Sequence, residues 1–456
     1  MNKTVWEKLN EEQMKELMDF NEEYRQFLSR SKTERTFVIN SVELLRKAGY
    51  RELSETEGAL QAGDKVYVNN RGKNLCAFII GKQDLTKGMN VLGAHIDSPR
   101  TDLKQKPVYE SNGMVYLDTH YYGGIKKYQW VARPMALQGV VCKKDGTVID
   151  ISIGDNPGDP VFGFSDLLIH LSADQLQKPA AKVIEGEQLD LLCGSIPLKG
   201  EEKDPVKANL LKILKEKYDI EEDDFISAEI EAVPAGEARD YGFDSSMILG
   251  YGHDDKVCGY TSLRALIDSD IPEKTACCIL SDKEEVGSMG NTGMQSRFFE
   301  NVILEMLERN GQGTFRALNQ VLSNSAMLSS DVSIAYDPNF PEVMEPRNSA
   351  YFGKGICFNK FTGRGGKGGS SDANAEYVAR VRRVMEDSGI TYQTCELGKV
   401  DAGGGGTIAY ILANLNMDVI DAGICVQNMH APFEVVSKAD VYEAYRAYMA
   451  FVKDMD

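Results

Sequence analysis

Two adjacent glutamates, Glu284 and Glu285, stand just beyond the end of an apolar run in the sequence. Residues Thr275–Leu280 are all apolar or small and predict a buried strand, and a glycine-rich turn, Gly287–Gly290, follows the acids. A buried strand rarely ends in two like charges unless a cation or a proton relieves their repulsion. Ligands of open α/β sheets bind at the carboxyl ends of strands. We therefore expect this pair to face a metal site.

Two histidines occupy similar positions at the ends of apolar segments. His95 follows the apolar run Met89–Gly93, and Asp97 lies two residues further on, which places both side chains on one side of an extended chain. A carboxylate beside an imidazole can fix the tautomer of a metal-binding histidine. His430 follows the apolar segment 419–426. Each is either a metal ligand or a hydrogen-bonded structural histidine at a strand end.

Two aspartates have the same pair of interpretations. Asp254 precedes a predicted helix, Val257–Ile267, and is a helix N-cap or a ligand, whereas Asp331 is a turn residue or a ligand. Taken together, these segments combine two histidines with several carboxylates at the edges of apolar elements. That mixture suits zinc and related divalent ions. One ion needs fewer acids than the chain offers, which favours two ions that share an anionic ligand.

The elements that position these residues predict an α/β fold. Two helices between about residues 9 and 49 and a hairpin around Asn69–Gly72 come before the strand that leads to His95. Beyond residue 240, strands alternate with helices, with helices at about 294–322 and 371–387 and strands near 351–358 and 418–425. This alternation predicts a mixed, mostly parallel sheet flanked by helices.

Between about residues 100 and 165 the α/β pattern gives way to short alternating strands and turns. This pattern predicts an antiparallel, β-rich module. We therefore expect a discontinuous catalytic domain, residues 1–98 and 240–456, with a β-rich domain inserted at residues 99–239. Two glycine-rich runs, Gly363–Gly369 and Gly403–Gly406, predict binding loops, because glycine lets the backbone approach a ligand closely.

The length, net charge and cysteine pattern of the chain predict its number of domains, its partners and its location. A chain of 456 residues predicts two domains, and a formal net charge of −18 argues against nucleic acid or an anionic membrane as a partner. The nine cysteines are scattered without a CxxC spacing, and the N-terminus lacks the apolar core of a signal peptide. The longest apolar runs are too short to span a membrane. These features predict a cytoplasmic protein with reduced thiols.

The order of the motifs resembles the M18 family of metalloaminopeptidases, which comprises the aspartyl aminopeptidases and their bacterial relatives. The motifs are Gly93–Pro99, His253–Asp255, Glu284–Ser288, Ser330–Asp331 and Met429–Glu434, with Tyr121–Gly124 and Leu168–Leu171 in the inserted module. The resemblance implies a zinc-exopeptidase-like fold, a peptide substrate and a homo-oligomer. In the family this is a dodecamer built partly through the inserted module.

The resemblance also implies a role for each site residue. His95, Asp254 and Asp331 would bind one divalent ion, and Asp254, Glu285 and His430 would bind the other, with Asp254 bridging. Asp255 stands where the family has asparagine, so either aspartate is a candidate bridge. Glu284 would be the general base acting on a metal-bridging water, and Asp97 would orient His95. Zinc is the expected metal, and cobalt and manganese are alternatives because they also accept oxygen ligands.

The implied function is removal of the N-terminal residue from peptides. The chain departs from the aspartyl aminopeptidases where Ile334 and Asp337 stand near the family's pair of histidines, and in the glycine-rich loop after Lys360. A preference for acidic N-terminal residues is therefore not implied. Candidate substrate-binding residues are His170, Lys360 and Gly406, with Lys360 either pairing with a substrate carboxylate or solvated.

Two alternatives to an aminopeptidase remain open at this stage. One is a related metallo-amidohydrolase or deblocking peptidase that acts on acylated substrates. The other is a non-catalytic shell or binding protein built on a peptidase fold. The intact Glu284 argues against the second, because a scaffold has no use for a spare carboxylate beside a ligand.

Overall fold

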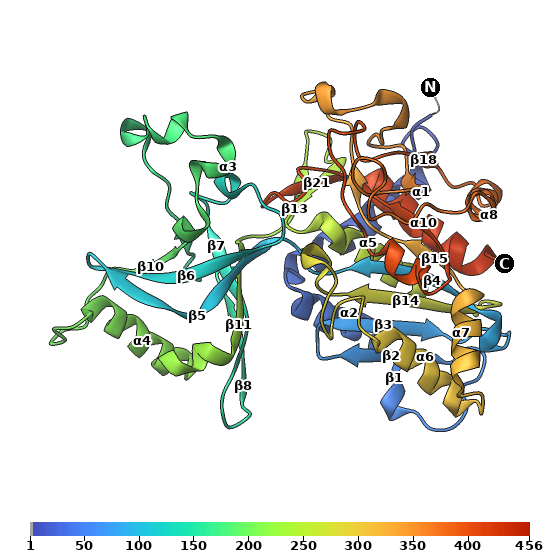
Figure 1. The fold of residues 1–456 in the computed structure, drawn as a ribbon, viewed down its shortest axis with the longest axis horizontal. Coiled ribbons are helices and arrows are strands. Elements are labelled where there is room, and N and C mark those ends of the chain that lie inside the picture. The colour runs from blue at the N-terminus through green and yellow to red at the C-terminus, as the bar shows by residue number, and fades with distance from the viewer. Residues whose placement is uncertain (1–2) are drawn as a thin grey trace. The chain divides into compact units, whose positions relative to one another are not determined.

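A mixed sheet of nine strands forms the centre of the first of two structural units (Figure 1). The computed structural model describes residues 3–456, and this unit comprises Met1–Asp97, Ala238–Met429 and Glu434–Asp456. In order across the sheet the strands are β1 (Arg51–Glu52), β2 (Lys65–Asn70), β3 (Asn74–Ile79), β14 (Thr275–Ser281), β4 (Met89–His95), β15 (Ala326–Ser329), β19 (Asp418–Gly423), β17 (Ile356–Asn359) and β18 (Tyr392–Thr394). Strands β14, β4, β15 and β19 pair in parallel, so their carboxyl ends meet at one edge.

Helices cover both faces of this sheet because its central strands are apolar on both sides. Every residue of β3, β4 and β14 is buried. Successive residues alternate between faces, so Leu92 packs into one core and Val91 into the other. The first core takes residues from α1 (Glu11–Arg30), α2 (Glu34–Lys47), α5 (His253–Ile267), α8 (Ala375–Asp387) and α10 (Lys438–Asp454), and the second from α6 (Phe298–Arg309), α7 (Phe315–Ser323) and α9 (Ala409–Ala413). The expected α/β architecture is thus confirmed.

A smaller sheet in the same unit supports the start of α5. Its strands, in order, are β12 (Arg239–Tyr241), β13 (Met247–Gly250), β21 (Glu434–Ser437), β20 (Cys425–Gln427) and β16 (Ser333–Ile334). Strand β13 leads into α5 and pairs antiparallel with β21, with Gly250 opposite Glu434. This pairing places a buried glutamate beside the turn that begins α5.

The second unit comprises Ser98–Glu237 with His430–Phe433, and it contains an antiparallel sheet of seven strands. In order these are β8 (Val148–Ile153), β7 (Met135–Cys142), β11 (Ala228–Pro234), β5 (Arg100–Ser111), β6 (Met114–Tyr122), β10 (Leu191–Gly194) and β9 (Gly163–Phe164), accompanied by the helices α3 (Ala180–Val183) and α4 (Pro205–Tyr218). The alternation of strands and turns at about residues 100–165 predicted an antiparallel arrangement. Leu167, Leu168, Ile169 and Leu171 are all exposed in this unit, which is unusual for four large apolar side chains within five residues.

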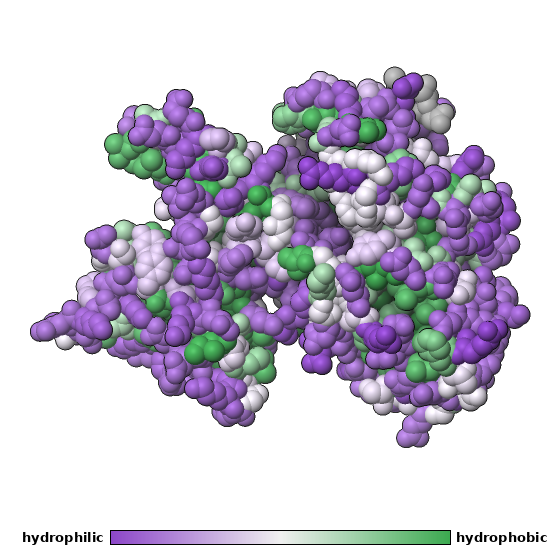
Figure 2. Space-filling model, in the orientation of Figure 1, coloured by the Kyte–Doolittle hydropathy of each residue, from purple (hydrophilic) through white to green (hydrophobic). Residues whose placement is uncertain are grey.

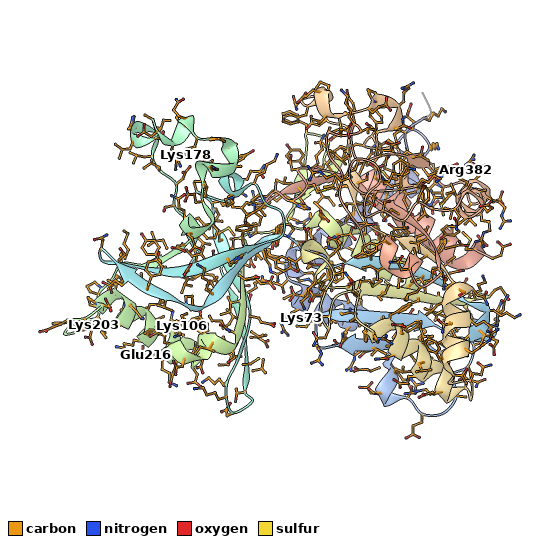
Figure 3. The ribbon with its side chains drawn as sticks, in the orientation of Figure 1. Lys73, Lys106, Lys178, Lys203, Glu216 and Arg382 are labelled. Atoms are coloured by element: carbon orange, nitrogen blue, oxygen red, sulfur yellow. The ribbon has the colours of Figure 1, made fainter. Side chains whose placement is uncertain are left out.

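The visible surface is largely hydrophilic, with apolar side chains in small groups (Figure 2). Charged side chains such as those of Lys203, Glu216 and Arg382 project outward (Figure 3). Lys73 is an exception, because its ammonium lies 3.6 Å from the buried carboxylate of Glu34. Among residues 3–456, the helices are either too short or too polar to cross a bilayer.

One strand begins later than the sequence predicts. The apolar pattern placed a strand near 351–358, but β17 starts only at Ile356. Gly353 and Gly355 have positive φ values of 75° and 84°, which an extended strand does not allow. Their N–H groups instead donate to the buried carboxylate of Asp440, at 2.9 and 2.7 Å. A side chain distant in sequence therefore decides where the strand begins.

The buried Asp440 should make stability depend on pH. Burial raises the pKa of its carboxyl to about 7. The folded protein then keeps a proton that the unfolded chain releases near pH 4, so stability falls as pH rises between these values, by at most about 1.4 kcal/mol per pH unit. We expect the advantage of the wild type over Asp440→Asn, measured as a difference in thermal midpoint, to be larger at pH 5 than at pH 8. An advantage that is equal at both pH values would contradict this assignment.

Candidate metal centre

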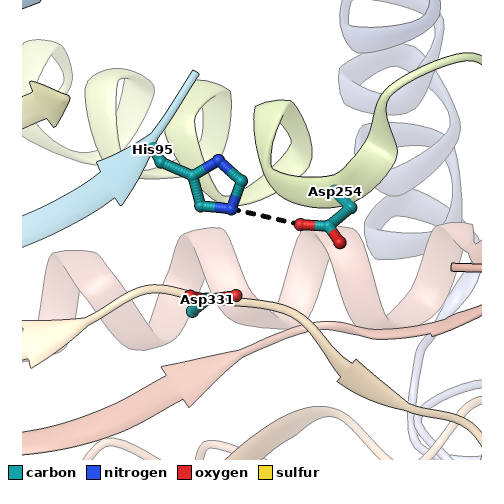
Figure 4. Close-up of side chains that lie close together, drawn as sticks. All are labelled: His95, Asp254 and Asp331. Atoms are coloured by element: carbon teal, nitrogen blue, oxygen red, sulfur yellow. Dashed lines mark ion pairs between the residues drawn. The ribbon is translucent and has the colours of Figure 1, made fainter. Parts of the chain in front are cut away.

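Three side chains from different elements converge at the carboxyl edge of the large sheet. His95 is the last residue of β4, Asp254 lies in the first turn of α5, and Asp331 follows β15 (Figure 4). Their ligand atoms all lie within 4.8 Å of one another, and His95 Nε2 is 3.2 Å from Asp254 Oδ1. All three residues are buried. The parallel pairing of β4 with β15 brings the first and last of them together.

Glu284 and Glu285 begin a single 3₁₀ turn, Glu284–Val286, after β14. The turn is bounded by two left-handed residues, Lys283 with a φ of 67° and Gly287 with a φ of 98°. The glycine after the acids thus closes the turn. His95, Glu284 and Glu285 form a second group of ligand atoms within 4.8 Å, and Glu284 Oε2 lies 3.9 Å from His95 Nε2.

The carboxylate of Asp97 holds the glutamate turn and His95 together. Its Oδ1 accepts the backbone N–H of Glu284 at 3.1 Å, and its Oδ2 accepts that of Glu285 at 3.2 Å. Its Oδ1 also lies 3.4 Å from His95 Nδ1. The predicted role of Asp97, orientation of His95, therefore covers only part of what this buried side chain contacts. It also caps the N-terminus of the turn that presents both acids.

The hydrogen bonds of the two candidate histidines define their tautomers. His95 Nδ1 lies 3.1 Å from the carbonyl oxygen of Asp97. His430 belongs to the second unit, where its Nδ1 lies 2.7 Å from the carbonyl oxygen of Gly124. A carbonyl can only accept, so Nδ1 carries the proton in both rings. When the ring is neutral, each Nε2 has a lone pair, as a metal ligand requires.

The buried carboxylates of the centre lie close enough to affect one another. Burial, reinforced by the charge of Asp255, holds the pKa of Asp331 well above its usual range. Burial acts to lower the pKa of His95, but hydrogen bonds with Asp254 and Asp97 and the charge of Glu284 outweigh it and raise that pKa. Such a concentration of negative charge, next to an imidazole nitrogen, is the environment that a divalent cation stabilises. The donor set therefore fits zinc.

Two further carboxylates near the centre accept backbone N–H groups: Asp255, the alternative bridge expected from the sequence, and Glu434, which was given no role. Asp255 Oδ2 accepts the backbone N–H of His95 at 3.3 Å, so its side chain turns toward the strand rather than into the ligand group. Glu434 Oε2 accepts the backbone N–H of Asp254 at 2.9 Å. The signal for Glu434 was its position at the start of a strand four residues after His430. Its partner could not be read from the sequence.

His253, next to Asp254, is a structural histidine. Its Nδ1 lies 2.6 Å from the hydroxyl of Tyr24, and its Nε2 lies 3.2 Å from the carbonyl oxygen of Ile248. The Nε2–H donates to that carbonyl, so Nδ1 accepts from the tyrosine. Burial lowers the pKa of His253 to about 3, and the ring stays neutral.

The three candidate substrate residues are all exposed. His170 lies in a 3₁₀ turn of the second unit, Ile169–Leu171. Gly406 lies in the loop before α9. The ammonium of Lys360 pairs with the carboxylate of Asp372, which Lys367 also contacts at 2.8 Å. Lys360 was expected either to pair with a substrate carboxylate or to be solvated. In the structure it is exposed but paired with a carboxylate of its own loop.

Comparison with known proteins gives consistent matches. A family model described as Aminopeptidase I zinc metalloprotease (M18) matches residues 27–452. A probable M18 family aminopeptidase 1 of Clostridium acetobutylicum is 56% identical over 456 residues, with 99% of this chain and 98% of the relative aligned.

Solved structures are similar along nearly the whole chain. The crystal structure of an M18 family aminopeptidase from Thermotoga maritima has a TM-score of 0.96 at 44% identity, covering 99% of both chains. The S. cerevisiae mApe1 dodecamer has a TM-score of 0.77 at 23% identity, covering 96% of this chain and 97% of that chain, which shows a shared fold.

The contacts of Asp97 predict the effect of replacing it. Asp97→Asn keeps the shape of the side chain but substitutes an amide nitrogen, which cannot accept, for one of the two oxygens that bind the glutamate turn. Loss of such a supporting contact typically weakens metal binding about 10- to 100-fold. We expect this loss in zinc titrations. Asp440→Asn, the same change at a buried site away from the centre, should keep wild-type affinity. Equal affinities in all three proteins would refute the supporting role of Asp97.

Proposed function

Because the chain belongs to the M18 family of zinc metalloaminopeptidases, we propose that it removes N-terminal residues from peptides at a pair of divalent ions, with Glu284 as general base. The observation that supports this most directly is the placement of Glu284 and Glu285 within 4.8 Å of a buried histidine that also faces Asp254. An exposed acid pair would have no such neighbours.

The proposal assigns the ligands as follows. His95, Asp254 and Asp331 hold one ion, and Asp254, Glu285 and His430 hold the other, with Asp254 shared. The geometry of the first group supports its assignment, and His430 enters on the sequence resemblance and on its tautomer. When bound, the zinc ions supply Lewis acidity that lowers the pKa of water and polarises the scissile carbonyl.

Glu284 is suited to move the proton. Its side chain is 18% exposed, whereas that of His95 is 2% exposed, so Glu284 can meet a substrate that arrives from solvent. In the proposed reaction its carboxylate takes a proton from the attacking water as the new C–O bond forms. It then gives that proton to the amine as the C–N bond breaks. General acid–base help of this kind contributes about 10²- to 10⁴-fold to the rate.

Assembly and location are part of the proposal. We propose a homo-oligomer formed through the second unit, where four large apolar side chains between Leu167 and Leu171 are exposed. The similar mApe1 of S. cerevisiae is a dodecamer. The acidic net charge of −18 supports peptide substrates over nucleic acid or membrane. A cytoplasmic location stays a prediction from the sequence.

The division of labour between the two glutamates can be tested directly. Glu284→Gln should keep both metals but lose at least about 100-fold in kcat on amino-acyl p-nitroanilides, because an amide cannot accept the proton. Glu285→Gln, the matched control, should lose metal. Metal content by mass spectrometry and steady-state kinetics separate the two outcomes. Metal loss in Glu284→Gln with retention in Glu285→Gln would mean that the roles are reversed.

The pairing of Lys360 with Asp372 predicts the response to acidic substrates. A lysine neutralised by its own loop offers little attraction to a substrate carboxylate. In a panel of amino-acyl p-nitroanilides offered to the metal-loaded enzyme, we expect no preference for Asp or Glu over neutral residues. Lys360→Ala should change kcat/KM for the Glu substrate less than about twofold. An acidic preference that disappears in Lys360→Ala would show that the lysine recognises substrate.

A further inference from the structure

Three polar side chains meet beside the turn that carries Glu284 and Glu285. The hydroxyl of Thr292 donates to Asp282 Oδ2 at 2.6 Å, and Lys283 Nζ lies 3.2 Å from the same carboxylate oxygen. The ammonium of Lys283 also donates to the hydroxyl of Thr292. We call these three side chains the Lys283 cluster. Each of them contacts the other two, so the cluster is a closed set of hydrogen bonds.

The cluster is largely buried at the end of β14. Asp282 directly follows that strand, and both Asp282 and Thr292 are 2% exposed. The side chain of Lys283 is 30% exposed. A buried carboxylate is costly unless a cation or hydrogen-bond donors contact it. Asp282 has both kinds of partner, and they come from the two other members of the cluster.

The backbone of Lys283 is in the left-handed region, with a φ of 67°. Glycine adopts this conformation freely, whereas a residue with a side chain adopts it at a cost in free energy. The carbonyl oxygen of Lys283 accepts the N–H of Ser288 at 2.7 Å, which closes the turn around Glu284. The contacts of the lysine side chain with Asp282 and Thr292 offset the cost of this conformation. They therefore favour a lysine where glycine would otherwise suit the backbone.

The loop that follows the two acids returns to the same cluster. The N–H of Asp282 donates to the carbonyl oxygen of Thr292 at 3.3 Å, and Asn74 Nδ2, at the start of β3, donates to that oxygen at 2.7 Å. A Cβ on Gly290 would lie 3.7 Å from Cδ of Lys283, so the loop passes over the lysine side chain. Thr292 thus ties the end of the loop to the residues that precede the acids.

We propose that Asp282, Lys283 and Thr292 are positioning residues for Glu284. The cluster fixes the backbone directly before this glutamate, and Asp97 accepts its N–H at 3.1 Å. In this role none of the three touches the reacting atoms. A general base must stay within hydrogen-bond reach of the proton that it takes, so a small displacement lowers the rate more than it weakens binding. The kinetic part of this inference rests on the proposed function, whereas the order of the loop can be measured without substrate.

Three variants test the cluster. Thr292→Val removes the hydroxyl but keeps the shape, Thr292→Ser keeps the hydroxyl, and Lys283→Gly removes the side chain while suiting the left-handed backbone. The matched control is Thr86→Val, because the hydroxyl of Thr86 also donates to an aspartate, Asp84, before the amino end of β4. Hydrogen–deuterium exchange of peptides spanning residues 282–297 reports the order of the loop. Steady-state kinetics and bound metal report the effect on catalysis.

We expect Thr292→Val and Lys283→Gly to exchange at least about fivefold faster across residues 282–297, because the end of the loop loses its tie to the sheet. Both should lose about 10- to 100-fold in kcat, with KM changed less than about twofold. Metal content should stay at the wild-type level, because the N–H of Glu285 keeps its bond to Asp97. Thr292→Ser and Thr86→Val should match the wild type in every measurement.

Wild-type exchange or wild-type kcat in Thr292→Val would overturn the inference, even if Lys283→Gly fails to fold. Equal losses in Thr292→Ser and Thr292→Val would also overturn it, because the hydroxyl would then not be the cause. Metal loss in step with kcat would show that the cluster supports the ligands instead of Glu284, which is equally contrary. A wild-type protein without peptidase activity would refute the proposed function alone, and loop exchange would still decide whether the cluster orders the turn.

Discussion

The buried carboxylate of Asp97 is the interaction on which the centre depends. One of its oxygens is close to the imidazole of His95, and its two oxygens accept the N–H groups of Glu284 and Glu285. Two parallel strands, β4 and β14, therefore end in a common polar junction. The strands alone would bring their ends near one another, since Ser281 is in register with His95. The carboxylate converts this nearness into a defined orientation for the histidine and both acids.

A similar principle recurs around the centre, where carboxylates hold backbone groups. Asp255 accepts the N–H of His95, and Glu434 accepts the N–H of Asp254. Hydrogen bonds from backbone N–H groups to buried carboxylates are strong, and they fix the backbone at the residues that carry the candidate ligands. The negative charge that makes the site attractive to cations thus extends beyond the ligands. Several of these carboxylates accept backbone N–H groups and so position the candidate ligands. This support distinguishes a preorganised site from a chance cluster of acids.

Much of this arrangement could be predicted from the sequence, for identifiable reasons. The apolar runs of β4 and β14 are long enough to specify buried strands, and polar residues at their ends point to one edge of a sheet. By contrast, Glu434 and Asp255 contact backbone atoms, which leave no pattern in side-chain type. The start of β17 at Ile356 likewise depends on Asp440, a residue distant in the sequence. The pairing of Lys360 with Asp372 inside an irregular loop had no periodic signal at all.

The insertion of the second unit immediately after Asp97 has a consequence for biosynthesis. During translation His95 and Asp97 emerge first, and the ribosome then makes residues 98–237, which contain all seven strands of the second unit, before Asp254, Glu285 and Asp331 appear. Early in synthesis the nascent chain carries only His95 of the five proposed ligands, too few to retain a divalent ion. If these residues bind metal as proposed, the metal can stabilise the protein only after the long-range pairing of β4 with β14 and β15, a kind of contact that forms slowly. The metal would then stabilise a sheet that has already formed and would not direct the pairing of its strands.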